Sequence, residues 1–344
     1  MKDTTMANVE PRADAVFEGG GVTGIALVGA VQAFEEAGFQ WQNVAGTSAG
    51  SITAALLAVG YSAAELKEIM DTRVDFPDLM DATRIGGLWL VGPWLSLLIS
   101  RGMYRGDYFL KRMRDLIAEK KGKQRVTFAD LIMDKVPGDS QEDYEKKYRH
   151  KLQVVASDIS RNEMLLLPRD IGKLGRRLDN LEVALAVRMS MSIPFFFKPV
   201  VMRESGKEHW IVDGGMLRNF PIDLFDSPAG QKPPWPTFGF LLCEEPREEH
   251  IGGLISMARA MVNTMTTAHD REALERADKR RIVRIPVGNY NANNFKLDAN
   301  DRAWLYNSGY RAARQFLDGP PPWDFDEYVA RRLECCMSKE TARR

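Results

Sequence analysis

Two strand–turn–helix units within the first sixty residues constrain the fold of this chain more than any other feature. A short apolar strand is predicted at residues 13–18, followed by three glycines and by a helix over residues 22–37 that Gly38 ends. A second short strand begins at Asn43, and an alanine-rich helix is predicted from residue 51 to residue 59. Two such units in succession predict an α/β sandwich with parallel strand pairing.

The remainder of the chain continues this alternation of strand and helix signals. Four prolines within residues 226–236 predict an irregular segment, and the charged residues 137–149 are expected to form a surface loop or a short helix. Because strands and helices are predicted on both sides of these segments, we do not divide the domain there. Further strands are predicted at residues 152–156, 210–212, 237–242 and 281–285, and further helices at 63–72, 106–120, 180–189, 251–278 and 299–317.

Charge balance and cysteine content argue against several classes of protein. The 47 Lys and Arg residues equal the 47 Asp and Glu residues in number, whereas nucleic-acid-binding proteins usually carry a basic excess. Cys243, Cys335 and Cys336 form neither a disulfide framework nor a zinc-binding pattern, which favours a reducing compartment. Residues 1–15 hold no secretory signal, and the apolar window 85–100 is too short and too broken to span a membrane. We therefore expect a cytoplasmic protein, peripheral at most on a membrane.

The pentapeptide Gly46-Thr47-Ser48-Ala49-Gly50 fits the G-x-S-x-G pattern of a nucleophile elbow. In that sharp strand-to-helix turn, the two glycines leave room for crossing backbones, and the serine stands at a helix N-terminus that favours negative charge. The alternative is a serine that only caps the helix. The apolar strand before the turn and the small-residue helix after it favour the elbow, with Ser48 as the candidate nucleophile.

The glycine-rich residues 19–24 fit G-x-G-x-x-G, a pattern that also occurs in dinucleotide-binding folds. Those folds need an acidic residue about 20 positions later to hold the ribose. No Asp or Glu occurs between Ala37 and Ala64. Because consecutive glycine N–H groups beside a helix N-terminus can bind an anion, we expect this loop to serve an oxyanion rather than a pyrophosphate.

A nucleophilic serine needs a base, and the chain offers four histidines and one well-placed aspartate. We expect His150 to be solvated within a basic run and His209 to lie in a turn, while His250 and His269 fall in or near a long predicted helix. None follows a strand end with a glycine-rich turn, so all four are expected to be structural. Asp213 ends an apolar strand before two glycines, which fits either a catalytic base or an Asx-turn.

Three motifs in this order resemble those of the patatin-like phospholipase family: Glu-Gly-Gly-Gly-Val-Thr-Gly at residues 18–24, Gly-Thr-Ser-Ala-Gly at 46–50 and Asp-Gly-Gly-Met-Leu-Arg-Asn-Phe-Pro at 213–221. Two further stretches are also similar to the family: Arg-Gly-Met-Tyr-Arg-Gly-Asp, which begins at Arg101, and Ser-Met-Ser-Ile-Pro-Phe-Phe-Phe-Lys-Pro, which begins at Ser190. The resemblance implies a three-layer α/β/α sandwich with a mostly parallel central sheet. It implies a domain over residues 13–318, with an N-terminal tail (1–12) and a C-terminal extension (319–344).

The family resemblance further implies a lipid acyl hydrolase with a Ser–Asp dyad, in which Ser48 is the nucleophile and Asp213 its base. No metal or other cofactor is implied. Many members carry Lys or Arg where this chain has Thr23. The absence of that positive charge is expected to weaken binding of an anionic head group or to lower activity. The oxyanion hole should persist, because it is built from backbone N–H groups. The implied oxyanion-hole residues are Gly19, Gly20, Gly21 and Ala49, and the other motif glycines are Gly24, Gly46, Gly50, Gly214 and Gly215.

Residues 85–125 are expected to face a membrane. The window 85–100 carries Trp89 and Trp94, and residues 101–125 hold nine Lys or Arg against three Asp or Glu. An apolar segment beside a basic one suits an anionic membrane surface; the alternative is a buried loop and a solvated helix face. We expect a phospholipase A or lysophospholipase that acts on phospholipid or lysophospholipid at a transient membrane surface, without nucleic acid.

Two other functions remain open from the sequence. One is an α/β-hydrolase esterase whose Ser-Asp-His triad uses His250 or His269, although an elbow at Ser48 leaves little chain for the usual preceding strands. The other is a non-catalytic protein that binds a nucleotide or a lipid with residues 19–24.

Overall fold

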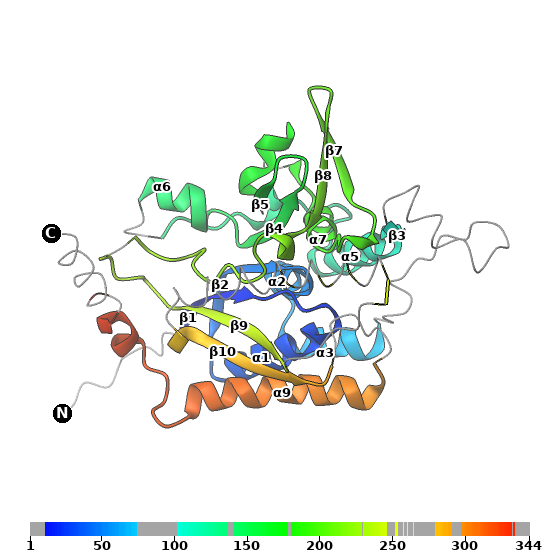
Figure 1. The fold of residues 1–344 in the computed structure, drawn as a ribbon. Helices are drawn as coiled ribbons and strands as arrows, with labels where there is room; N and C mark the ends of the chain where they lie inside the picture. Colours follow the sequence, from blue (N-terminus) through cyan, green and yellow to red (C-terminus); the bar gives the residue numbers. More distant parts are fainter. Residues whose placement is uncertain are drawn as a thin grey trace, which may run out of the picture.

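A central sheet of eight strands organises the molecule (Figure 1), in the order β10-β9-β1-β2-β4-β8-β7 with β5 paired to β4. The computed structural model describes residues 11–73, 102–136, 140–177, 180–228, 230–245, 252–253, 257, 260, 264, 279–290, 297–331 and 333. The strands of the sheet are β1 (Arg12–Phe17), β2 (Gln40–Thr47), β4 (Leu152–Asp158), β5 (Glu163–Leu167), β7 (Val200–Glu204), β8 (Lys207–Asp213), β9 (Thr237–Glu244) and β10 (Ile282–Gly288).

Parallel pairing dominates this sheet. Strand β1 lies parallel to both β2 and β9, and the pairs β9–β10 and β2–β4 are parallel as well. The pairs β4–β5, β4–β8 and β7–β8 are antiparallel. A small second sheet pairs β3 (Gly102–Tyr104) with β6 (Phe195–Phe197). The expected α/β fold with a mostly parallel central sheet is confirmed.

The two faces of the sheet are covered by different parts of the chain. The larger apolar core lies under the helices, and Figure 1 shows the long α9 running beside α1 on that side. A smaller core on the other face joins Val16 of β1 to Tyr148, Phe220, Ile222 and Phe225. The helices are α1 (Ile25–Glu36), α2 (Ala49–Val59), α3 (Ala63–Thr72), α5 (Asp107–Lys121), α6 (Gln141–Asp143), α7 (Val183–Ser190) and α9 (Ala299–Asp318).

Most of the predicted elements agree with these bounds, and the differences are local. A 3₁₀ turn over Gly21–Gly24 precedes α1, because the glycine loop must first turn away from β1. Helix α2 starts directly after Ser48 rather than at residue 51. The segment predicted as a loop or short helix contains α6 and a π-helical turn over Tyr144–Tyr148. Residues 137–139, and nearly all of the helix predicted at 251–278, lie outside the described residues.

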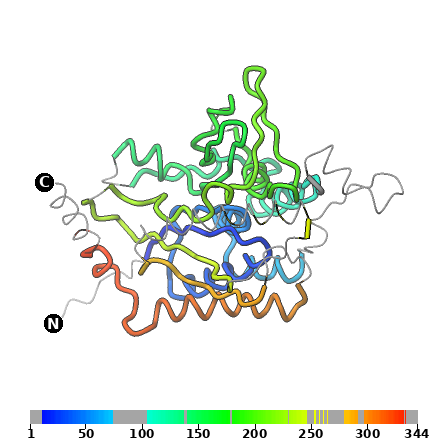
Figure 2. The backbone as a smooth tube through the Cα atoms, viewed as in Figure 1, coloured from blue at the N-terminus to red at the C-terminus, as the bar shows by residue number. Residues whose placement is uncertain are grey.

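Packing continues beyond α9 on the C-terminal side. The ring of Trp323 lies 4.7 Å from that of Phe238 in β9, and Tyr328 is buried. In the backbone trace, the β7–β8 hairpin projects from the body of the molecule (Figure 2).

Within the described residues, no helix combines the length and the apolar character needed to cross a bilayer.

Candidate active site

Ser48 occupies a strained backbone position between β2 and α2. Its φ of 51° and ψ of −126° lie outside the regions that L-residues normally adopt. Such strain costs on the order of 1–3 kcal/mol and concentrates at functional sites. The Ser48 side chain makes no capping hydrogen bond to α2, so it is not an ordinary helix cap. Its hydroxyl instead contacts the Sδ of Met191 at 3.6 Å.

Gly46 and Gly50 allow the backbones at this turn to touch. A Cβ on Gly46 would collide with the carbonyl group of Gly50, and a Cβ on Gly50 would collide with the carbonyl oxygens of Phe17 and Glu18. The end of β2, the first turn of α2 and the end of β1 are therefore in backbone contact. This close crossing is the physical reason for the glycine spacing in G-x-S-x-G.

Asp213 lies at the end of β8 and uses its two carboxylate oxygens differently. Its Oδ1 accepts a hydrogen bond of 2.8 Å from the N–H of Gly215, so the Asx-turn does form. Its Oδ2 is buried and has no geometric hydrogen-bond partner. Burial raises the pKa of Asp213 to about 6, while hydrogen bonds from the Ser48 hydroxyl and the Gly215 N–H act in the opposite direction. A carboxylate of this kind can accept a proton near neutral pH.

The register of three strands brings Asp213 to the same edge of the sheet as Ser48. Thr47 of β2 pairs with Val155 of β4, and the next residue, Ala156, pairs with Asp213. Strand β8 runs antiparallel to β4, so its last residue returns to the level at which β2 ends. Ligand sites of α/β sheets usually lie at the carboxyl ends of the parallel strands, where these two side chains are found.

The glycine loop packs against the elbow and presents free N–H groups. A Cβ on Gly19 would lie 3.0 Å from the Cβ of Ser48, so the two segments are neighbours. Gly19 donates its own N–H to the carbonyl of Asn219 at 3.4 Å. Within the described part of the chain, the N–H groups of Gly20, Gly21 and Ala49 have no such acceptor. Free N–H groups beside a nucleophile can stabilise the negative charge of an oxyanion.

Three polar side chains hold this loop, and two of them link separate motifs. The Nδ2 of Asn219 donates to Glu18 Oε1 at 3.2 Å and to the carbonyl of Gly19 at 3.1 Å. Glu18 Oε2 accepts the N–H of Leu242 on β9 at 2.6 Å. The Thr23 hydroxyl donates to the carbonyl of Gly20 at 2.7 Å. Thr23 is fully buried, so this residue braces the loop where a basic side chain would need solvent or a counter-charge.

Ser190 is a supporting residue whose role the sequence reasoning missed. At the end of α7, its Oγ accepts the N–H of Ser48 at 2.9 Å and donates to the carbonyl of Val155 at 2.6 Å. It thereby ties the elbow to β4. Ser190, Glu18 and Asn219 all fall within the stretches that resemble the family, but only their contacts reveal what they do.

The two histidines of the described residues, His150 and His209, are both buried, and the expectations about their surroundings were wrong. His150 is buried rather than solvated, because it pairs with Ile132 in a β-bridge and its ring lies against Phe128. His209 lies within β8 rather than in a turn, and its Nδ1 is 2.8 Å from Oδ2 of the buried Asp158. His250 and His269 lie outside the described residues.

The described residues contain no group of three or more His, Cys, Asp or Glu side chains that could hold a metal ion. Cys243 is half-buried, and Cys335 and Cys336 lie outside the described residues. The candidate site in the described residues therefore consists of a serine, a buried carboxylate and a row of backbone N–H donors.

Comparison with known proteins relates this arrangement to one family. The sequence profile of the family described as patatin-like phospholipase matches residues 15–226. The uncharacterized protein YqhO of Bacillus subtilis (strain 168) is 35% identical over 308 residues, which are 88% of this chain and 97% of YqhO. The uncharacterized protein R571 of Acanthamoeba polyphaga mimivirus is 27% identical over 213 residues, which are 61% of this chain and 60% of R571.

A solved structure agrees at the level of the fold. The crystal structure of VipD from Legionella pneumophila aligns with a TM-score of 0.55 at 18% sequence identity, covering 90% of this chain and 67% of VipD. The family supports lipid ester hydrolysis as the activity and lipids as the substrate class. With a profile match over more than half of its length and a relative as similar as YqhO, this chain belongs to the patatin-like phospholipase family.

Proposed function

We propose that this protein is a phospholipase A or lysophospholipase that cleaves carboxylic esters of membrane lipids through a Ser48–Asp213 dyad. The observation that carries the proposal is the buried Asp213 carboxyl, whose Oδ2 is unpartnered beside a strained serine and whose pKa is raised to about 6. A serine and a carboxylate supported only by ordinary capping and turn contacts would need neither the burial nor the strain.

In the proposed first half-reaction, Ser48 Oγ attacks the ester carbonyl while Asp213 Oδ2 takes the hydroxyl proton. Oxyanion stabilisation is proposed for the loop of Gly19, Gly20 and Gly21 together with Ala49. The N–H groups of Gly20, Gly21 and Ala49 support this role, because they have no backbone acceptor among the described residues. The N–H of Gly19 already donates to the carbonyl of Asn219. Collapse of the tetrahedral intermediate breaks the ester bond, and the leaving alcohol takes the proton back from Asp213.

The second half-reaction mirrors the first. A water molecule attacks the acyl-Ser48 carbonyl and gives its proton to Asp213, and the free fatty acid leaves as Ser48 regains the proton. The low polarity around Asp213 supports this use of a carboxylate, because an unperturbed Asp has a pKa of about 3.9 and is a weak base. No step in this scheme requires a metal ion or a histidine.

We further propose that the catalytic domain covers residues 13–318 and that the protein acts from the cytoplasm on a membrane surface that it visits transiently. The profile match over residues 15–226 and the continuous sheet from β1 to β10 support one domain of this extent. Trp323, in the proposed extension over residues 319–344, packs against Phe238 of β9 with ring centroids 4.7 Å apart.

The test compares the wild-type protein with Ser48→Ala on a panel of phospholipids, lysophospholipids and a short-chain nitrophenyl ester. Loss of a nucleophile typically lowers kcat by about 10³-fold or more. We expect such a loss on every ester with the fold intact, because Ser48→Ala removes a small hydroxyl whose contacts are a 3.6 Å approach to the Sδ of Met191 and a hydrogen bond to the Asp213 carboxylate. Labelling by a fluorophosphonate should occur in the wild type alone. Near-wild-type hydrolysis by Ser48→Ala would refute the dyad, and a lipid-binding protein would show neither labelling nor turnover.

A further inference from the structure

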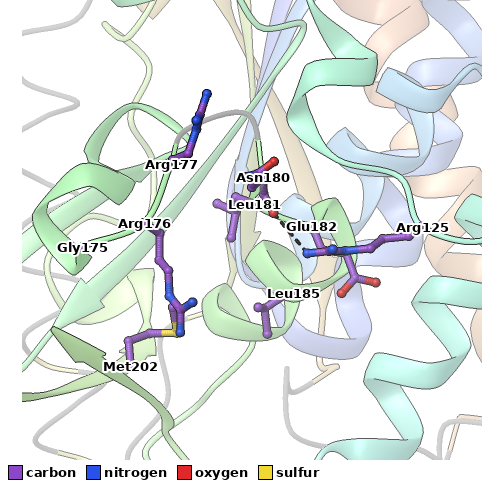
Figure 3. Close-up of a pocket in the computed structure, with 9 residues that line it drawn as sticks. All are labelled: Arg125, Gly175, Arg176, Arg177, Asn180, Leu181, Glu182, Leu185 and Met202. Atoms are coloured by element: carbon purple, nitrogen blue, oxygen red, sulfur yellow. Dashed lines mark hydrogen bonds between the residues drawn. The ribbon is translucent and has the colours of Figure 1, made fainter.

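A pocket lies away from the dyad, at the other end of α7. The cavity measures about 600 Å³ and is lined by residues that follow α5, by the segment before α7, and by α7 and β7 (Figure 3). Leu185 in the first turn of α7 lines this pocket, whereas Ser190 at the last turn contacts Ser48. At 1.5 Å per residue, these two ends of α7 are roughly 8 Å apart along the helix axis. The pocket is therefore separate from the proposed site of hydrolysis.

Positive charge dominates the rim of this pocket. Arg125 and Arg176 enter from opposite sides in Figure 3, and Arg177 lies at the edge. Among the residues that the structure describes, none of these three guanidinium groups forms an ion pair. Arg125 makes a single long hydrogen bond of 3.3 Å to the carbonyl of Asn180. All three side chains are exposed. Since a guanidinium has five N–H donors, most of their donors bind no protein atom among the described residues and are available to a ligand.

Among the described residues, Glu182 is the carboxylate that lines the pocket, and its charge is not directed at the three arginines. Glu182 is held by Arg114 through two hydrogen bonds, from Nε at 2.6 Å and from Nη2 at 2.7 Å. This bidentate pair satisfies the negative charge of Glu182 from outside the pocket. The described lining residues therefore carry an excess of positive charge that a ligand can use.

The inner wall is apolar. Leu181 and Met202 are buried and Leu185 is half-buried, and all three line the same cavity. A small hydrophilic anion would leave this wall uncovered, whereas an apolar molecule without charge would leave the arginines unused. The combination fits a ligand with an anionic head and an alkyl portion.

We propose that this pocket binds a phosphate-bearing amphiphile. The phosphate lies between Arg125 and Arg176, and the start of the alkyl chain lies on Leu181, Leu185 and Met202. Arginine favours phosphate because its planar fork of donors matches two phosphate oxygens at once. The shared chemistry is the phosphate group, which comes either from the head of an acidic lipid or from a soluble phosphate compound. The proposal does not depend on the Ser48–Asp213 dyad.

The test measures binding by isothermal titration calorimetry with octyl phosphate below its micelle concentration. This probe has no carboxylic ester, so hydrolysis at Ser48 does not interfere. Inorganic phosphate supplies the charge alone, and octyl glucoside supplies the alkyl chain alone. The variants are Arg125→Gln, Arg176→Gln and Leu185→Ala. The matched control is Arg314→Gln, an arginine on α9 that pairs with Asp318 away from this pocket.

We expect octyl phosphate to bind about tenfold tighter than either partial probe, and each Arg→Gln change to weaken it about tenfold, as the loss of a charged hydrogen bond predicts. Arg314→Gln should bind like the wild type. Leu185→Ala should weaken octyl phosphate and leave inorganic phosphate unchanged. Turnover of a short-chain ester should be unaffected in all four variants, which separates this pocket from the dyad.

Several outcomes would overturn the proposal. Equal affinity for octyl phosphate and octyl glucoside would mean that the pocket does not recognise phosphate. Equal losses in Arg125→Gln and Arg314→Gln, or no binding of octyl phosphate, would remove the site altogether. If inorganic phosphate bound as tightly as octyl phosphate, and Arg125→Gln and Arg176→Gln weakened both ligands equally, the pocket would bind phosphate but would not recognise an alkyl chain. That result would refute the proposal of an amphiphilic ligand.

Discussion

At the scale of single residues, Asp213 combines a turn contact with an unused carboxylate oxygen. One oxygen accepts the N–H of Gly215, and the other is buried without a geometric partner. Elsewhere in the described residues, a buried acid such as Asp158 has both oxygens engaged, by His209 and by the N–H of Ser160. A buried carboxylate oxygen without a geometric partner is costly, so its presence beside Ser48 supports the proposed chemical role.

The raised pKa of Asp213 predicts the pH dependence of the reaction. The base works only when deprotonated, so kcat/KM should rise with pH and level off above the Asp213 pKa of about 6. One pH unit below that value, about a tenth of the carboxylate is ionised, and the rate should fall about tenfold. Initial rates with a soluble ester from pH 4.5 to 8.5 measure this limb.

The control for this profile is Asp213→Asn, which keeps the shape and removes the proton acceptor. Its kcat should fall about as much as that of Ser48→Ala, and its residual rate should no longer rise with pH near pH 6. A wild-type limb centred near pH 4, the range of an unperturbed Asp, would contradict a desolvated base.

The variant His209→Gln tests whether this histidine supports the structure or takes part in catalysis. His209→Gln breaks a buried contact with Asp158, and loss of a hydrogen bond to a charged partner costs about 1.5–3 kcal/mol. The melting temperature should fall by several degrees, while kcat per folded molecule stays within about threefold of the wild type. His250→Gln and His269→Gln should retain activity as well. A folded histidine variant as inactive as Asp213→Asn would replace the dyad with a triad.

At the scale of elements, the elbow depends on two segments that approach without side chains between them. The first turn of α2 touches the end of β1 at Gly50, and a Cβ there would collide with the backbone of Phe17 and Glu18. Neither backbone can move without shifting a strand in the middle of the sheet. The nucleophile is therefore positioned by close packing of rigid elements, which is how precise catalytic geometry is usually achieved.

Gly50→Ala tests this packing, with Gly172→Ala as its control. Gly172 lies in a 3₁₀ turn, has no positive φ, and a Cβ there would meet nothing within 4 Å. Overpacking typically costs about 1–3 kcal/mol or more, so Gly50→Ala should lower the melting temperature and abolish turnover. Gly172→Ala should remain within about 1 kcal/mol of the wild type in chemical denaturation. Equal stability of the two variants would show that the elbow tolerates a side chain.

At the scale of the whole molecule, three of the nine basic side chains in residues 101–125 pair with described acidic residues outside that segment. Arg114 pairs with Glu182, Lys120 with Glu65 and Lys123 with Asp130. The basic excess in this part of the sequence therefore acts partly to join elements rather than to attract a membrane. The apolar window with Trp89 and Trp94 lies outside the described residues, so its membrane-facing role stays a prediction.

Replacement of Trp89 and Trp94 by Ser tests that role. If both reach the lipid surface, hydrolysis on vesicles should fall about tenfold, whereas hydrolysis of a soluble ester should change less than about twofold. The control is Trp304→Ser, a partly exposed tryptophan on α9 with an exposed fraction of 39%. Equal losses on vesicles and on the soluble ester would mean that Trp89 and Trp94 belong to the core.

The α/β class, the position of the elbow and the candidate pair Ser48 and Asp213 could all be predicted from the residues alone. Those features are set locally, because a strand that turns into a helix through glycines imposes its own backbone geometry. Which groups meet depends instead on contacts between distant segments, which local patterns do not specify. Antiparallel β8 returns Asp213 to the end of β2, and contacts between distant segments bury His150 and His209. The same long-range packing places Ser190 against the backbone of Ser48 and brings the arginines of the pocket together.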